Sequence, residues 1–364
     1  GYRTVFSQDG VAGTGPAVTG PGRLRLDVAN SRILVSDSVK IIAADLTTGN
    51  RSIVSDNSGS FGTGPNFQQI RGVAVDAANS RLLVADELLN AVLAVDPVTG
   101  DRTLFSDINN GTGTLFSNLR DVIVDAPNNR ALVSDNALDA VLAVDMTTGN
   151  RTVISQFSTS TGTGPDFGNP THFTLDAANQ RLLVACFENF AVFAMDLATG
   201  DRSIISSNAT TAGPGFVRQR GIVLQASEQR ALVVDTDGQA LLSVDLSQNV
   251  GDRAIFSDSG TNIGAGPAFV APASIAIDEA NQRAFVVNPN GGSIYEVDLV
   301  TGDRVILSDA VNGTGPVFSI PRGVTLDSTN NRLLVIANPP SALFVVDIAT
   351  GDRTILSDAS NGTG

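Results

Sequence analysis

The sequence has very few of the residues that build disulfides and metal sites. It contains one cysteine, Cys186, and one histidine, His172, among 364 residues. A single cysteine excludes a disulfide within the chain, and a single histidine excludes a metal site built on two or three imidazoles. No apolar run approaches the ~18 residues of a membrane helix, so membrane insertion is not expected.

Positive charge is also scarce, and arginine carries nearly all of it. Lys40 is the only lysine, so 22 of the 23 basic residues are arginines, and 37 acidic residues bring the net charge to −14. A protein this acidic is not expected to bind nucleic acid or an anionic membrane surface. The single lysine, the negative charge and the loops rich in Ser, Thr and Asn favour an extracellular or periplasmic protein.

An internal repeat of about 50 residues runs through the whole chain. Aspartates that end an apolar run recur at spacings of 51, 49, 51, 49, 53 and 49 residues, at Asp45, Asp96, Asp145, Asp196, Asp245, Asp298 and Asp347. In a unit such as residues 71–106, turn signals of Asp, Asn, Gly and Pro separate four short apolar runs. Four-strand repeats of this length are typical of propeller blades. The sequence therefore predicts an all-β fold, a seven-bladed β-propeller of four-stranded antiparallel blades.

One unit also resembles known propellers. Residues 71–96, RGVAVDAANSRLLVADELLNAVLAVD, resemble an NHL-type blade in G-x-x-V-D, in V-A-D-x-x-N and in the final V-D, and are similar to YWTD and gluconolactonase-like blades. The resemblance implies a propeller across all seven units. Relatives of the gluconolactonase type hold a divalent metal with Glu, Asn and Asp, and NHL-like lyases hold a histidine-bound metal. The inner strands here offer no matching Glu, and one histidine does not supply the second set.

One outer-strand segment is surplus. Eight segments fit the fourth strand of seven units, the first at residues 3–7 and the last at residues 353–357. We expect one domain over residues 1–364, with residues 3–7 closing the ring beside the last unit. Two alternatives stay open: a frayed end, or addition of this strand to a blade of a neighbouring molecule, which leads to self-association.

Candidate binding residues stand where the first strand of each unit begins. Strand direction places the second–third and fourth–first loops on one rim, and long loops on a rigid scaffold favour a binding site there. Four arginines recur on this rim, five residues before the end of the first strand: Arg71, Arg120, Arg220 and Arg322. Their planar forks suit a carboxylate, phosphate or sulfate. Alternatively, they pair with the aspartates that end the second strands, Asp37, Asp86, Asp135 and Asp235.

The fourth unit breaks this pattern and adds three candidate ligand-binding residues. It lacks both the arginine and the aspartate and carries Thr171, His172, Cys186, Phe187 and Glu188 instead. We expect these five to lie together on the same rim, because functional sites are where a repeat departs from its rules. His172, Cys186 and Glu188 therefore join the four arginines as candidates. No spacing indicates a nucleophile–base pair, so no catalytic residue is assigned.

Oxygen-rich loops leave Ca²⁺ open as a cofactor. The pattern S-D-x-x-N-G-T-G places Asp, Asn and Thr together at residues 107–113, 309–315 and 358–364. Such oxygens suit Ca²⁺, although the same residues also make ordinary turns. No metal ligand is assigned.

These observations favour a non-enzymatic secreted or surface propeller that serves as a binding or self-assembling scaffold. Its partner would be a protein, or an anionic saccharide or small molecule held at the arginines. The alternative, implied by the resemblance, is a metal-dependent hydrolase or lyase of gluconolactonase-like type acting on an anionic sugar or lactone.

Deleting residues 1–8 tests the surplus strand. If it closes the ring, the truncated protein unfolds at a lower temperature while remaining monomeric, because a strand edge loses its partner. Thermal unfolding and size-exclusion chromatography measure both properties. Loss of oligomers from an equally stable protein would support strand donation, and no change in either property would contradict both ideas.

Overall fold

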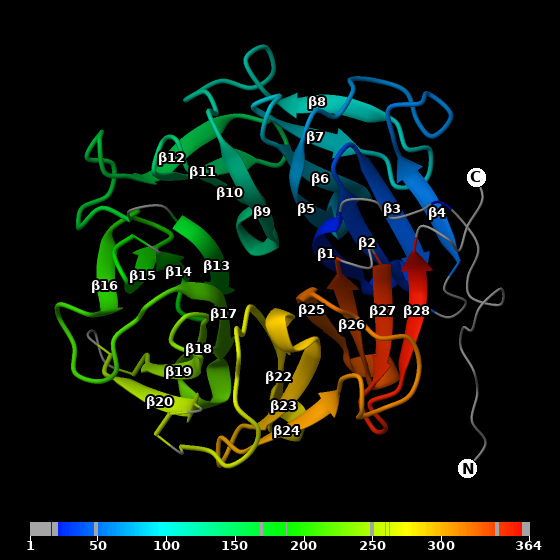
Figure 1. Ribbon diagram of the computed structural model, residues 1–364. Coiled ribbons are helices and arrows are strands. Elements are labelled where there is room, and N and C mark those ends of the chain that lie inside the picture. The colour runs from blue at the N-terminus through cyan, green and yellow to red at the C-terminus, as the bar shows by residue number, and fades with distance from the viewer. Residues whose placement is uncertain are drawn as a thin grey trace. The chain divides into compact units, whose positions relative to one another are not determined.

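The computed structural model describes residues 16, 21–46, 50–167, 170–186, 188–247, 251–258, 260–261, 263–338 and 342–358. Its strands form seven antiparallel sheets, and each sheet consists of four consecutive strands (Figure 1). Short 3₁₀ helices are the only helices among the described residues, and none is long or apolar enough to cross a membrane.

The strands fall into four classes by their place in the sheet. The first strands are β1 (Pro21–Asp27), β5 (Ile70–Asp76), β9 (Leu119–Asp125), β13 (Pro170–Asp176), β17 (Gln219–Gln225), β21 (Ser274–Asp278) and β25 (Pro321–Asp327). The second strands are β2 (Arg32–Asp37), β6 (Arg81–Asp86), β10 (Arg130–Asp135), β14 (Arg181–Cys186), β18 (Arg230–Asp235), β22 (Arg283–Asn288) and β26 (Arg332–Ala337).

The third and fourth strands complete each sheet. The third strands are β3 (Lys40–Asp45), β7 (Ala91–Val95), β11 (Ala140–Asp145), β15 (Ala191–Asp196), β19 (Ala240–Asp245), β23 (Ser293–Asp298) and β27 (Ala342–Asp347). The fourth strands are β4 (Arg51–Ser55), β8 (Arg102–Ser106), β12 (Arg151–Gln156), β16 (Arg202–Ser207), β20 (Arg253–Asp258), β24 (Arg304–Ser308) and β28 (Arg353–Asp358). The 3₁₀ helices are η1 (Val28–Asn30), η2 (Ala77–Asn79), η3 (Ala126–Asn128), η4 (Ala226–Glu228), η5 (Glu279–Asn281), η6 (Pro289–Gly291) and η7 (Ser328–Asn330).

The chain divides into two compact units. The first holds the described part of residues 1–156, 341–344 and 354–364, and the second that of residues 157–340 and 345–353. In the first unit, β5 contacts both β1 and β9; in the second, β17 contacts β13 and β21, and β21 contacts β25. Residues that begin the first strands are therefore neighbours within each unit.

The middle strands form the core because both of their faces are covered. In β6, the side chains of Leu82, Leu83, Val84 and Ala85 are all buried, which explains why the strand is a continuous apolar run rather than an alternating one. Leu82 and Val84 pack in one cluster with residues of β2 and β3, and Leu83 and Ala85 in another with residues of β10 and β11. Each sheet of this unit is thus held to the next by apolar contact.

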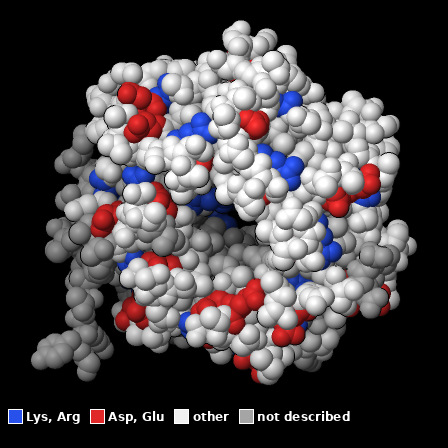
Figure 2. Space-filling view, turned by 180° about the vertical axis from the view of Figure 1, so that it is seen from behind, with Lys and Arg blue, Asp and Glu red and all other residues white. Residues whose placement is uncertain are grey.

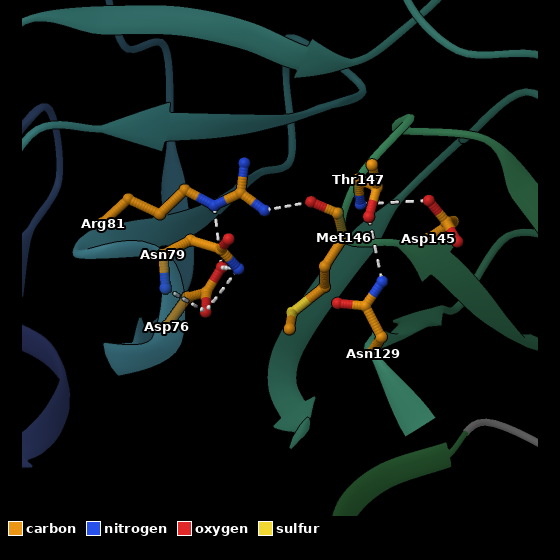
Figure 3. Close-up of polar contacts among 7 residues, drawn as sticks. All are labelled: Asp76, Asn79, Arg81, Asn129, Asp145, Met146 and Thr147. Atoms are coloured by element: carbon orange, nitrogen blue, oxygen red, sulfur yellow. Dashed lines mark hydrogen bonds and ion pairs between the residues drawn. The ribbon is translucent and has the colours of Figure 1, made fainter. Parts of the chain in front are cut away.

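The hairpin between the first and second strands of a sheet also reaches the next sheet. Asp76 accepts hydrogen bonds from Asn79 and from Nε of Arg81, the latter at 2.8 Å, and the Arg81 guanidinium donates onward to the carbonyl of Met146, after β11 (Figure 3). Five other hairpins repeat the Asp–Arg pair at 2.8–2.9 Å: Asp27–Arg32, Asp125–Arg130, Asp176–Arg181, Asp278–Arg283 and Asp327–Arg332. These repeated charges are structural.

A second repeated arginine begins each fourth strand, and it is buried. Arg151 is 5% exposed; its Nε donates to the carbonyl of Thr114 at 2.8 Å, and its Nη1 donates to Oγ of Ser106 on β8 at 2.7 Å. The same link to a serine on the preceding fourth strand recurs in Arg102–Ser55, Arg253–Ser206, Arg304–Ser257 and Arg353–Ser308. Burial lowers the pKa of Arg151. Because carbonyl and hydroxyl oxygens replace water around it, the charge is tolerated inside the protein.

A phenylalanine covers the guanidinium in six of the seven fourth strands. The ring centres lie 4.7–5.6 Å from the guanidinium carbon in Arg102–Phe67, Arg151–Phe116, Arg202–Phe167, Arg253–Phe216, Arg304–Phe269 and Arg353–Phe318. Each phenylalanine ends the long loop that precedes its sheet. The loop, the serine and the arginine thus form one buried joint between consecutive sheets.

The long loops lie differently from the sequence-based expectation. We expected them on the rim of the second–third loops, but the middle of residues 107–113 lies against the third–fourth turn of the following sheet. Thr112 donates through its backbone N and Oγ1 to Oδ1 of Asn150, at 2.8 and 3.0 Å. Gly111 has φ +71°, and a Cβ there would stand 2.1 Å from the carbonyl oxygen of Gly149, so the close approach requires glycine.

Of the two surplus candidates, residues 353–357 belong to the ordinary fourth strand of the last sheet, β28. Residues 3–7 lie outside the described residues, so closure of the ring by this segment remains a prediction.

Arg151→Lys is expected to lower the free energy of unfolding by about 1.5–3 kcal/mol, the range for hydrogen bonds to a charged group. An ammonium group cannot donate in the directions of a guanidinium fork, so part of the carbonyl set loses its donor. Urea unfolding measures the change, with the exposed Arg322→Lys as control. Equal stability of the two variants would contradict a role for the buried joint.

Candidate functional site

The four candidate arginines share an unusual backbone position. In β5 the pairing with β6 skips from Ile70 to Gly72, so Arg71 is an unpaired bulge residue. The same skip occurs at Arg120, Arg220 and Arg322. A bulge turns a side chain away from the regular alternation of the strand. Nothing in the spacing of the sequence indicated these bulges.

In the first unit, a single buried carboxylate engages Arg71 and Arg120. The Oε2 atom of Glu87 lies 2.5 Å from Nε of Arg71, and its Oε1 lies 3.4 Å from Nη2 of Arg120. Asn118 donates to the same Oε1 at 2.8 Å. Burial alone would raise the pKa of Glu87, but the hydrogen bonds from Arg71 and Asn118 and the charge of Arg120 outweigh it and lower the pKa.

Arg71 and Arg120 do pair with an acid, but not with the aspartates that end the second strands. Asp86 instead accepts backbone N–H groups from the loop before β5, from Gln68 at 2.7 Å and Gln69 at 2.9 Å. Asp135 and Asp235 make the same contacts with residues 117–118 and 217–218. A carboxylate can satisfy several buried N–H groups at once. Glu87, the partner of the arginines, is the residue that follows Asp86. None of the other six sequence repeats has an acid at this position.

Two further arginines in the first unit are also held by an acid. Nη2 of Arg25 donates to Oδ1 of Asp121 at 3.1 Å, and Nη2 of Arg23 lies 3.8 Å from Oδ2 of the same carboxylate. Asp121 is 7% exposed. The arginines of β1, β5 and β9 are therefore gathered around two internal carboxylates.

The second unit has arginines at the same strand starts but fewer acids. Arg218 pairs with Asp237, with Nη2 and Oδ1 2.8 Å apart. Arg220 and Arg322 make no ion pair or side-chain hydrogen bond with any described residue. Burial lowers the pKa of Arg220, and the neighbouring charges of Arg218 and Arg322 lower it further. Among the described residues, one of these three guanidiniums is thus paired with a carboxylate.

The residues around these guanidiniums are mostly uncharged. Arg220 and Arg322 belong to β17 and β25, and β21 lies between these strands. The corresponding residue before β21 is Ala273, which adds no charge. Gln219, beside Arg220, is 2% exposed, and neither its Oε1 nor its Nε2 has a hydrogen-bond partner. The equivalent positions in the first unit hold Ile70 and Leu119.

The fourth sheet brings its unusual residues to one end at the level of the backbone. Pro170 pairs with Cys186 and His172 with Ala185 in the register of β13 and β14. Cys186 is buried and Glu188 is exposed. Phe187 and the side chains of Thr171 and His172 lie outside what the structure describes, so their role in a site remains a prediction.

The oxygen-rich loops use their aspartates in turns. Oδ1 of Asp107 accepts the backbone N–H groups of Asn109 and Asn110 at 2.9 and 2.7 Å. Asp309 makes the same contacts with residues 311 and 312, and residues 359–364 of the third loop fall outside the described part. The described residues contain no group of three His, Cys, Asp or Glu side chains that could hold a metal.

Charged side chains elsewhere are mixed in sign. On the face shown in Figure 2, acidic and basic side chains lie beside one another on a surface that is mostly uncharged.

Comparison with solved structures identifies the fold. The β-propeller domain of Cps50 (Swd1) from Myceliophteria thermophila matches with a TM-score of 0.63 and 12% identity, over 92% of this chain and 98% of that one. The hydrazine synthase of Kuenenia stuttgartiensis matches with a TM-score of 0.62 and 12% identity, over 94% and 99%. This chain is a seven-bladed β-propeller. A structural genomics protein of unknown function from Bacteroides thetaiotaomicron follows at 0.50 and 13%, over 90% and 82%.

These likenesses show the fold of the propeller and no more. No family model matches the sequence, and no curated protein matches it. The resemblance to NHL, YWTD and gluconolactonase-like propellers therefore stays a prediction.

Glu87→Gln is expected to lower the free energy of unfolding at pH 7 by about 1.5–3 kcal/mol, because the charged acceptor of two guanidiniums is lost. Since the folded protein lowers the pKa of Glu87, this stabilisation is present above about pH 4.3 and is lost as the pH falls through the folded pKa. Urea unfolding at pH 7 and in acid measures both effects.

The exposed Glu228→Gln serves as the control and should change stability by less than about 0.5 kcal/mol. A Glu87→Gln protein that is as stable as the native one at pH 7 would contradict the network. So would a stability difference that stays constant into acid.

Proposed function

We propose that this propeller is a non-enzymatic binding protein that holds an anionic ligand at Arg218, Arg220 and Arg322. The observation that carries the proposal is the charge imbalance in the second unit, where Asp237 is the one described carboxylate paired with this group. Like charges held together destabilise one another. A bound anion would relieve that repulsion, and the free energy so released would contribute to affinity.

The chemistry of arginine supports binding rather than turnover. A guanidinium stays protonated at physiological pH and presents several N–H donors in a rigid plane. It therefore orients and neutralises an anion but does not exchange protons as a general acid or base would. The ligand would be an acidic group of a protein, a saccharide or a small molecule, as expected for an extracellular or periplasmic scaffold.

Arg220→Gln and Arg322→Gln are expected to weaken binding of citrate about 10- to 100-fold each, the equivalent of one charge-assisted contact. Isothermal titration calorimetry at low and at 0.15 M salt measures the loss, and added salt should weaken binding to the native protein. Arg71→Gln is the matched control, because it stands at the same bulge position but is engaged by Glu87.

The proposal fails if the native protein binds neither citrate nor sulfate. It also fails if Arg71→Gln reduces binding as much as Arg220→Gln while both variants remain folded by circular dichroism.

A further inference from the structure

The two units contain the same pair of backbone positions around their arginines. The backbone N–H of Glu87, which follows β6, donates to the carbonyl of Gln69 at 2.9 Å. The backbone N–H of Thr236, which follows β18, donates to the carbonyl of Arg218, also at 2.9 Å. Glu87 and Thr236 are thus equivalent in space as well as in the repeat. Arg71 and Arg220 are likewise equivalent, as the bulge residues of β5 and β17.

At the first of these positions the protein supplies its own carboxylate. Glu87 is 9% exposed. Its Oε2 pairs with Arg71 of the same sheet, and its Oε1 contacts Arg120 and Asn118 of the next sheet. A carboxylate fits this place because its two oxygens accept donors from two directions in one plane. In the first unit, the anionic partner of the arginines is therefore a residue of the chain itself.

At the second position the carboxylate is missing. Thr236 is 6% exposed and donates through Oγ1 to the carbonyl of Pro272 at 2.6 Å, so its side chain does not neutralise a guanidinium. Arg218 stands where Gln69 and Asn118 stand in the first unit, which adds a further positive charge. The second unit therefore keeps Arg220, the counterpart of Arg71, has Ala273 in the place of Arg120, and lacks the acid.

We infer that Arg218 and Arg220 bind a carboxylate of a second molecule, as Arg71 binds the carboxylate of Glu87. Thr236, in the place of Glu87, determines the specificity because it offers these arginines no carboxylate. The inference rests on the proposed anion site and names its ligand class, a carboxylate such as that of an acidic peptide or a uronate.

Replacing Thr236 by glutamate tests the inference, because it places a carboxylate of the chain itself at the position equivalent to Glu87. Thr236→Glu should reduce succinate binding at least tenfold, because its carboxylate competes for Arg220, and should raise the midpoint of thermal unfolding. Thr236→Gln, of the same size but uncharged, should bind succinate more tightly than Thr236→Glu, because it adds no competing charge. Titration of each variant with succinate, with the neutral diamide succinamide and with inorganic sulfate measures the preference; succinamide should not bind.

The reciprocal variant, Glu87→Thr, should remove the internal carboxylate from Arg71 and Arg120. The number of succinate molecules bound should then rise from one to two. Thermal unfolding confirms that this variant is folded, and the Thr236→Glu result stands independently of it. Trigalacturonate and triglutamate, compared on the native protein, then distinguish a saccharide from a peptide as the source of the carboxylate.

Two results would overturn the inference. One is succinate binding by Thr236→Glu that equals that of Thr236→Gln. The other is sulfate binding that depends on Arg220 without any succinate binding, in which case the anion site stands and the carboxylate class falls. If the native protein binds neither anion, the proposed function fails as well.

Discussion

The buried arginine at the start of each fourth strand is the interaction on which the rest of the structure depends. A guanidinium such as that of Arg151 is enclosed by the loop before its sheet, by a phenylalanine and by a serine of the preceding sheet. Such a charge is stable inside the protein only if nearly every donor meets an oxygen. The requirement fixes the path of the loop, the glycine at its closest approach and the spacing between consecutive sheets.

The arginines on the first strands take no part in this joint between the sheets. The bulges at Arg71, Arg120, Arg220 and Arg322 aim side chains away from the regular ladder. In the first unit Glu87 and Asp121 neutralise the arginines from within. In the second unit Asp237 alone pairs with the group, and Arg220 and Arg322 have no paired acid among the described residues. One repeated backbone thus supports both an internal ion-pair network and an uncompensated cationic cluster.

The fold could be predicted from the sequence because it is repeated. Four apolar runs per unit, bounded by Asp, Asn, Gly and Pro, specify a four-stranded sheet seven times over, and the structure confirms the seven-bladed propeller. The position of the arginines could be predicted from the same register, but their partners could not. Only one of the seven repeats has an acid at the position of Glu87, so no periodicity marks it. The aspartates that we expected to pair with the arginines accept hydrogen bonds from backbone N–H groups instead. The long loops were misplaced because their contacts reach the next sheet, which local pattern does not reveal.

Anomalous diffraction from a crystal soaked with 4-bromobenzoate tests the central claim most directly, because bromine locates the ligand and the carboxylate provides the charge. The account predicts a bromine peak beside Arg220 and Arg322, with the carboxylate turned toward their guanidiniums, and none beside Arg71 and Arg120. A bromine peak beside Arg71 and Arg120, or ordered ligand only at sites without arginine, would contradict it.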